Sequence, residues 1–200
     1  MKRRLFILAI LVICFVMVSS GTIAYYTFED KAHNVITTGG IKISIEEFTK
    51  TDEGLKPFPE EGITNIYPGA TASKIVNIKN ICENPAWVRV WIEYYIVDTN
   101  GQKLPLEVDG TDIPIATIKT LDGWYEEGGY YYYKEALLPG EITTNIFEEV
   151  YFDVLMDNRY QNSTTNIIIH AQAVQTDNNG TSVDEAKGWP LVIKGLAKSN

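Results

Sequence analysis

The segment from Trp87 to Val97 constrains the fold more than any other part of the chain. Apolar residues alternate along it with polar or aromatic ones, and the apolar set is Val88, Val90, Ile92, Tyr94 and Ile96. Successive side chains of a strand point to opposite sides of a sheet, so a period of two indicates a strand with one buried face. The pattern predicts a long strand at the centre of a sheet protein.

Weaker versions of the same alternation recur along the chain. Strands are expected at residues 41–46, 72–81, 143–155 and 167–175, and a short helix at residues 183–187 after Ser182. The turn signals between strands are Pro68-Gly69, Asn100-Gly101 and Gly128-Gly129. About eight strands with a turn roughly every ten residues predict an all-β fold, a two-sheet β-sandwich of the jelly-roll type.

The first 24 residues are typical of a signal peptide. A basic start at residues 2–4 precedes an apolar run at residues 5–18 and then small residues up to Ala24. As a helix this run would cover about 21 Å, less than the bilayer core of about 30 Å. Cleavage between Ala24 and Tyr25 is therefore the favoured interpretation, a cut after Ser20 is the second option, and a retained anchor is the alternative.

The sequence divides into four expected parts. They are a signal peptide (residues 1–24), an N-terminal arm (25–40), a β-sandwich domain (41–190) and a C-terminal tail (191–200). Cleavage would leave 14 basic against 26 acidic residues, a formal net charge of −12. This charge argues against nucleic acid as a partner and against binding to an anionic membrane surface. Membrane contact is expected only through an uncleaved signal segment.

The residues offer little for catalysis. The histidines are His33 and His170, and no H-E-x-x-H or G-x-S-x-G motif is present. The adjacent acids Glu148 and Glu149 are expected on opposite faces of a strand. Cys82, which alone would remain after cleavage, is expected to be a small buried hydrophobe. We therefore predict no enzyme activity, no metal and no cofactor.

Several motifs resemble the TasA/camelysin family of secreted proteins from Gram-positive bacteria. The junction Gly21-Thr22-Ile23-Ala24-Tyr25-Tyr26, followed by Gly39-Gly40-Ile41-Lys42-Ile43-Ser44, is similar to the start of that family. Further landmarks are Ile66-Tyr67-Pro68-Gly69, Asn84-Pro85-Ala86-Trp87-Val88-Arg89-Val90, Gly123-Trp124-Tyr125, Leu138-Pro139-Gly140-Glu141 and Ala171-Gln172-Ala173-Val174-Gln175. The resemblance covers nearly the whole chain. One departure is Phe28, which stands near a place where the family commonly has an acidic residue.

The resemblance implies a function as well as a fold. It implies a jelly-roll domain exported with a SipW-type signal, processed by a dedicated signal peptidase, and used as a subunit of biofilm-matrix or surface fibres. The partners would be further copies of the chain or related matrix subunits. Camelysin-like relatives are sometimes labelled metallopeptidases, which gives an alternative for which the sequence supplies no ligand set.

The arm is the candidate for self-assembly. Its strand-forming residues are Tyr25, Tyr26, Phe28, Val35 and Ile36. A free sheet edge is a template for another strand, so an arm donated to the next subunit would propagate as a filament. The other outcome is an arm that folds back on its own subunit.

The aromatic run around Trp124 has two interpretations. Trp124, Tyr125 and Tyr131 are candidates for a contact face, which would make the protein a surface adhesin or glycan-binding module. Alternatively, the tyrosines at 130–133 pack as an ordinary strand, pointing alternately in and out. Packing is the favoured interpretation.

Overall fold

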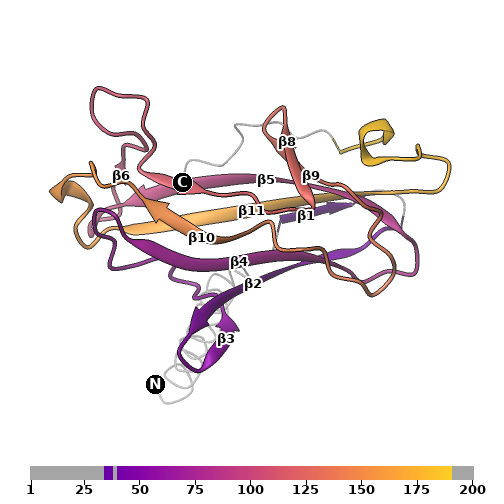
Figure 1. The fold of residues 1–200 in the computed structure, drawn as a ribbon, viewed down its shortest axis with the longest axis horizontal. Helices are drawn as coiled ribbons and strands as arrows, with labels where there is room; N and C mark the ends of the chain where they lie inside the picture. Colours follow the sequence, from indigo (N-terminus) through magenta and orange to yellow (C-terminus); the bar gives the residue numbers. More distant parts are fainter. Residues whose placement is uncertain (1–33, 38–39, 191–200) are drawn as a thin grey trace, which may run out of the picture. The chain divides into compact units, whose positions relative to one another are not determined.

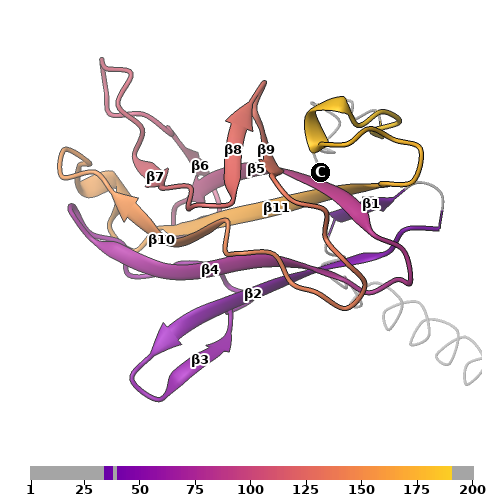
Figure 2. The same cartoon turned by 45° about the vertical axis from the view of Figure 1, so that its right-hand side comes forward.

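Two β-sheets form the part of the chain that the computed structural model describes, residues 34–37 and 40–190 (Figures 1 and 2). The strands are β1 (Asn34–Thr37), β2 (Ile43–Thr51), β3 (Gly54–Pro57), β4 (Thr71–Asn80), β5 (Ala86–Val97), β6 (Lys103–Leu104), β7 (Ala116–Ile118), β8 (Trp124–Glu127), β9 (Tyr130–Tyr133), β10 (Phe147–Phe152) and β11 (Thr164–Gln175). Two 3₁₀ turns are η1 (Asn158–Tyr160) and η2 (Val183–Glu185). The chain divides into two compact units between Ala32 and His33, and the first lies outside the described residues.

The two sheets confirm the predicted all-β sandwich. Sheet A has the order β1-β11-β5-β9-β8, and β6 also pairs with β5. Sheet B has the order β3-β2-β4-β10-β7. Among the described strands the chain changes sheet six times: after β1, β4, β6, β7, β9 and β10.

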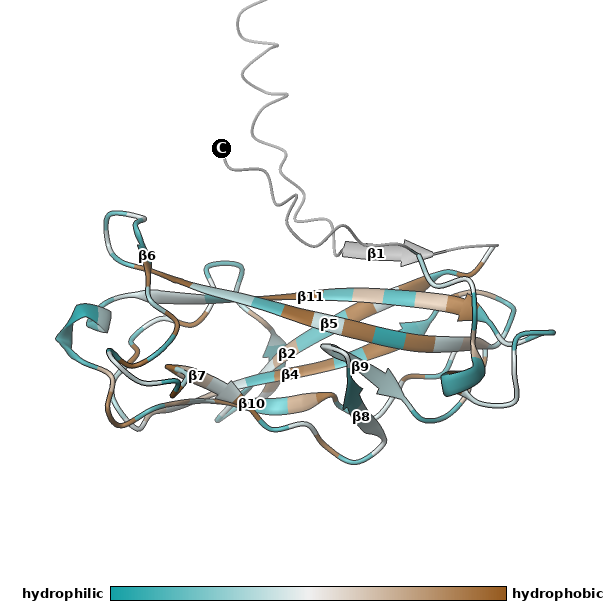
Figure 3. Cartoon of the chain, turned by 90° about the horizontal axis from the view of Figure 1, so that it is seen from above, coloured by the Kyte–Doolittle hydropathy of each residue, from teal (hydrophilic) through white to brown (hydrophobic). Residues whose placement is uncertain are grey.

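The predicted central strand is β5. It pairs antiparallel with β11 over its whole length, from Ala86 opposite Gln175 to Val97 opposite Thr164. The inward residues Val88, Val90 and Ile96 are fully buried, as the alternation predicts. Figure 3 shows alternating hydrophobic and hydrophilic residues along both strands.

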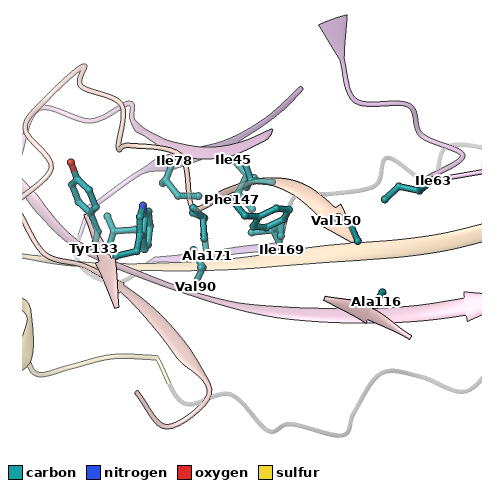
Figure 4. Close-up of a cluster of buried hydrophobic side chains, with 14 of the residues drawn as sticks. Ile45, Ile63, Ile78, Val90, Ala116, Tyr133, Phe147, Val150, Ile169 and Ala171 are labelled. Atoms are coloured by element: carbon teal, nitrogen blue, oxygen red, sulfur yellow. The ribbon is translucent and has the colours of Figure 1, made fainter. Parts of the chain in front are cut away.

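Large apolar side chains from both sheets fill the space between them (Figure 4). Fully buried members include Ile78 from β4, Phe147 and Phe152 from β10, and Ala171 from β11. Burying an isoleucine or phenylalanine side chain contributes about 1.5–3 kcal/mol relative to leaving it in water. The core therefore holds the sandwich together.

The strand expected at residues 143–155 is shorter than predicted. Strand β10 ends at Phe152, whose carbonyl accepts a hydrogen bond from the N–H of Gly69 at 3.1 Å. The chain then turns, and Val154, which falls within the expected strand, is 61% exposed. A register shift between Phe147 and Glu149 leaves Glu148 and Glu149 both exposed, which corrects their expected placement on opposite faces.

The helix expected at residues 183–187 is only the single turn η2. Ser182 occupies its N-cap position but makes no side-chain capping bond. The backbone is already extended at Ala186, because the next residues run along the outer face of sheet A, where Ala186 and Trp189 pack against a buried cluster. Tertiary packing therefore prevents the helix from growing.

Part of the expected arm is a strand of sheet A. Strand β1 pairs parallel with β11, and Val35 and Ile36 lie opposite Ala171 and Gln172. In this structure the residues of β1 therefore pair within their own chain. Tyr25, Tyr26, Phe28, the Ala24–Tyr25 bond, His33 and the tail at 191–200 lie outside the described residues.

Candidate functional site

The three residues expected to form a contact face do not share one face. Trp124 is only 4% exposed, lies in the core between the sheets, and donates its indole N–H to the Thr144 carbonyl at 3.0 Å. Tyr131 is half-buried against the same core. Tyr125, next to Trp124 in β8, packs instead on the outer face of sheet A. Neighbouring residues of a strand point to opposite sides, so this trio cannot form one platform.

The tyrosine run packs as the favoured interpretation predicts. Tyr131 and Tyr133 point into the core. Tyr130 and Tyr132 lie on the outer face, where Tyr132 stacks on Tyr125 with ring centroids 5.3 Å apart. Gly128 and Gly129 both have positive φ, which suits the tight turn between β8 and β9.

A second apolar cluster covers the outer face of sheet A. Trp87 of β5 and Val174 of β11 are buried there by Val183 of η2. The indole of Trp87 donates to the carbonyl of Asn179 at 3.1 Å. The side chain of Asn179 bonds the backbone of Lys187 in both directions, at 3.0 and 2.8 Å. The segment at residues 176–190 is thus a closed loop fixed to the sheet.

Arg89 connects that segment to the sheet. Its Nε donates to Oε1 of Gln172 at 2.7 Å, and Nη1 donates to the hydroxyl of Tyr132 at 3.2 Å. Its guanidinium lies 4.1 Å from the ring centre of Tyr130 and 4.6 Å from that of Trp189. Gln172 is fully buried and donates to the carbonyl of Pro190 at 3.1 Å. We call Arg89, Gln172, Tyr130, Tyr132 and Trp189 the arginine clasp.

Sequence reasoning missed the arginine clasp. The alternation placed Arg89 on the outer face, but nothing local indicated that Trp189, a hundred residues later, would cover it. The clasp depends on Arg89 of β5 lying opposite Gln172 of β11. The register between these two strands cannot be read from the sequence and is given by the structure of the sheet.

His170 lies on the outer face of sheet A, beside Trp91 of β5. Its ring stacks on Trp91 with centroids 4.2 Å apart, and Nε2 is 3.2 Å from Oε2 of Glu93. Its backbone lies opposite Asn34, the first residue of β1. The cluster of His170, Trp91 and Glu93 is therefore near Asn34, where the described part of the arm begins.

Strand β5 has an unpaired stretch on the side away from β11. There β9 pairs with Arg89 and Val90, and β6 pairs with Ile96 and Val97. Among the described residues no strand pairs with this side of β5 from Trp91 to Tyr95. Figure 1 shows β6 and the β8–β9 hairpin at separate places along β5. We call this stretch the β5 gap.

A cavity of about 110 Å³ lies beside the β5 gap, between the sheets. Its lining is Ile92, Tyr94, Ala116, Ile118, Tyr131, Val150 and Ile167. Several of these side chains are only half-buried, which indicates that solvent reaches the cavity. Burial raises the pKa of Tyr94 and of Tyr131, with further contributions from Glu107 and Glu126 respectively. Both phenols therefore stay neutral over the physiological range.

Comparison with known proteins adds little to this geometry. No family model matches the chain, and no curated protein matches it. One similar solved structure is the AfaE-3 adhesin from Escherichia coli, with a TM-score of 0.31 and 13% sequence identity. The alignment covers 68% of this chain and 97% of the adhesin chain. A likeness at this level carries no argument about function.

The described residues contain no group of three or more histidine, cysteine or acidic side chains placed to hold a metal ion. In residues 34–37 and 40–190 no helix is long and apolar enough to cross a bilayer. Cys82 is a free, half-buried thiol beside the core, and its Sγ lies 3.0 Å from Oδ1 of Asn80. It is therefore less buried than expected.

Proposed function

We propose that the protein is a secreted structural subunit of an extracellular, biofilm-type matrix, and that it assembles into fibres by donating its N-terminal arm. Export would use the signal segment, and a signal peptidase would release the arm by cutting between Ala24 and Tyr25. The partners are further copies of the chain or related matrix subunits, and the location is the matrix or the cell surface.

The observation that carries this proposal is the position of β1. It lies at the edge of sheet A and covers four of the twelve residues of β11. It pairs in parallel, which is slightly less stable per residue than antiparallel pairing. A short edge strand of this kind can leave its own sheet and pair with the same sheet of another copy, because both pairings use the same residues in the same register.

The connection after β1 also suits exchange. Gly40 has φ of +76°, a left-handed conformation that glycine adopts at no steric cost, and no atom lies within 4 Å of where a Cβ would be. Strand β2 begins at Ile43 in sheet B. A change of arm direction at Gly40 would therefore leave the packed sandwich undisturbed. The sequence resemblance to TasA/camelysin proteins supports the same function.

A disulfide trap tests whether the arm is exchanged. Val35→Cys and Ala171→Cys place cysteines at opposed positions of β1 and β11 in a mature chain that also carries Cys82→Ala. Oxidation of assembled protein should give a ladder of covalent oligomers on a denaturing gel. The matched control is Val35→Cys with Cys82→Ala alone. A cross-link confined to single chains, in protein that forms fibres, would exclude exchange of β1.

A further inference from the structure

The cavity beside the β5 gap is open on one side of the sandwich, between β5 of sheet A and β7 of sheet B. No strand among the described residues lies along β5 from Trp91 to Tyr95 to close that side. Most of the lining side chains are only half-buried, namely Ile92, Tyr94, Ile118, Tyr131 and Ile167. A small molecule can therefore enter the cavity from solution without disturbing the core.

The size and lining of the cavity suit a single apolar ring. A dry apolar cavity of about 150 Å³ holds benzene, so about 110 Å³ with an open mouth accommodates one ring and excludes larger ring systems. The walls come from both sheets and are aliphatic or aromatic, including Ile92 of β5, Ile118 of β7 and Val150 of β10. Small-molecule sites are built in this way, with an apolar lining and a few polar groups that select the ligand.

The polar groups nearest this lining are acidic. Glu126 of β8 lies opposite Tyr131 of β9, and it shares the inward side of its strand with Trp124, two residues before it. Glu107 lies in the segment that leads into β7, opposite Pro114. Burial and then the charge of Glu107 raise the pKa of Tyr94, which places that carboxylate near the phenol. Both glutamates are exposed, so they border the mouth of the cavity.

The lysines closest in the chain to this lining point away from the cavity. Burial alternates from Ala116 to Thr120, which puts Lys119 on the exposed side together with Thr117. Nζ of Lys103 lies 5.5 Å from the ring centre of Tyr95, on the opposite side of β5 from Tyr94. The mouth therefore favours positive charge, as does the acidic chain as a whole.

We propose that this cavity binds a small organic cation, whose single ring enters the cavity while its ammonium group stays at the mouth near Glu107 and Glu126. The ring faces of Tyr94 and Tyr131 line the same site and also attract a cation. A carboxylate of the same shape would be repelled by both glutamates. The site needs no fibre assembly, so it stands or falls independently of the proposed function.

Three probes with the same ring and spacer test the choice of ligand. They are 2-phenylethylamine, 2-phenylethanol and 3-phenylpropionate, titrated calorimetrically into the mature chain from Tyr25. The amine should bind about tenfold more tightly than the carboxylate, with the alcohol between them. Equal binding of amine and carboxylate would overturn the proposed ligand class. Absence of saturable amine binding up to about 10 mM would overturn the site.

Isoleucine methyl NMR of the wild-type chain locates the bound amine. The methyl signals of Ile92, Ile118 and Ile167 should shift on titration, because these residues line the cavity. Ile43 is the control, since β2 is separated from β7 by β4 and β10 in sheet B. Shifts at Ile43 without shifts at the lining residues would place the amine elsewhere and overturn the assignment.

A cavity-filling variant tests the pocket itself. Ala116 lines the cavity from β7, so Ala116→Leu should weaken amine binding about tenfold. Thr117→Leu adds similar bulk on the exposed side and should leave binding unchanged. Thermal unfolding shows whether both variants fold, and the wild-type NMR titration decides the location if Ala116→Leu does not. Unchanged amine binding by a folded Ala116→Leu variant would contradict the site.

Charge-neutralising variants test the mouth. Glu107→Gln combined with Glu126→Gln should reduce the preference for amine over carboxylate from about tenfold to about twofold. Glu53→Gln is the control, because Glu53 precedes β3 at the edge of sheet B opposite to β7. A double variant that kept the full preference would show that these glutamates do not select the ligand, and would overturn the inference.

Discussion

Arg89 shows how one charged residue can fix a distant part of the chain. Its guanidinium lies over the rings of Tyr130 and Trp189 and donates a hydrogen bond to Gln172, which in turn donates one to the carbonyl of Pro190. Cation–π contacts contribute about 0.5–2 kcal/mol, and a hydrogen bond from a charged group about 1.5–3 kcal/mol. The clasp is therefore expected to hold residues 176–190 against sheet A.

Replacing Arg89 tests this role. Arg89→Met keeps the aliphatic stem but removes the charge and both hydrogen bonds, and should lower the free energy of unfolding by about 2–4 kcal/mol. The control is Arg159→Met, because Arg159 is exposed. Its ion pairs with Asp109 and Asp157 contribute about 0–1 kcal/mol, and its guanidinium is 5.9 Å from the ring centre of Tyr160. Urea unfolding measures both. Equal losses would show that the clasp adds nothing beyond a surface ion pair.

The tyrosines predict how stability changes at high pH. Burial raises the pKa of Tyr125, and its hydrogen bond to Asp184 raises it further; burial also raises the pKa of Tyr94 and Tyr131. A raised pKa means that folding favours the neutral phenol. The stabilisation is complete below the ordinary value of 10.0 and is lost as pH rises through the raised values.

A tyrosine titration checks that expectation. Ultraviolet absorbance of tyrosinate, recorded in the native and urea-unfolded protein, should show a group of native tyrosines ionising late. The melting temperature should fall over the same alkaline range. Tyr125→Phe should leave one fewer late-ionising group. Coincident native and unfolded titration curves would contradict the burial of these phenols.

At the residue scale, the burial of side chains was easier to predict from the sequence than the contacts between them. The alternation in β5 placed Val88 and Val90 inside correctly, because a period of two depends only on local geometry. It did not separate Trp124 from Tyr125 as members of a contact face, although the same rule puts neighbours on opposite sides. The Arg89–Gln172 contact depends on the pairing register, which no local pattern encodes.

Among the elements, the turn into β8 depends on a single glycine. Gly123 has φ of +97°, and a Cβ there would collide with Oγ1 of Thr144. Gly140 has a similar φ of +78° but open space around it. A left-handed conformation costs a non-glycine residue about 1–3 kcal/mol, so this pair of glycines separates backbone strain from steric collision.

Two alanine substitutions measure that difference. Gly140→Ala should cost about 1–2 kcal/mol through strain alone. Gly123→Ala should cost more, by roughly a further 1–3 kcal/mol, because Thr144 must move. Thermal or urea unfolding of the two variants gives the comparison. Similar losses would mean that the contact at Gly123 relaxes freely.

The long strands were predictable and the short ones were not. Strands β2, β4, β5 and β11 follow from alternation, because each has one face in the core. The premature end of β10 at Phe152 could not be foreseen, since it comes from a hydrogen bond to the loop at Gly69. Likewise, the parallel pairing of β1 with β11 is a long-range contact of only four residues.

At the scale of the whole molecule, composition and turn spacing were enough to predict two sheets. They were not enough to predict the gap left between β9 and β6, because that gap depends on where short partners happen to pair along β5. The self-assembly arm stays a prediction, because residues 25–33 lie outside the described part of the chain. Only the sheet register brings the cavity and the unpaired edge together.

Electron microscopy of three purified forms tests the central claim most directly. The forms begin at Tyr25, at Asn34 (which keeps β1) and at Gly40 (which lacks it), and circular dichroism confirms that each is folded. We predict filaments from the form beginning at Tyr25 and monomers from the form beginning at Gly40. Filaments from Asn34 would show that β1 alone is enough for donation. Filaments from Gly40 as abundant as those from Tyr25 would contradict assembly through the arm.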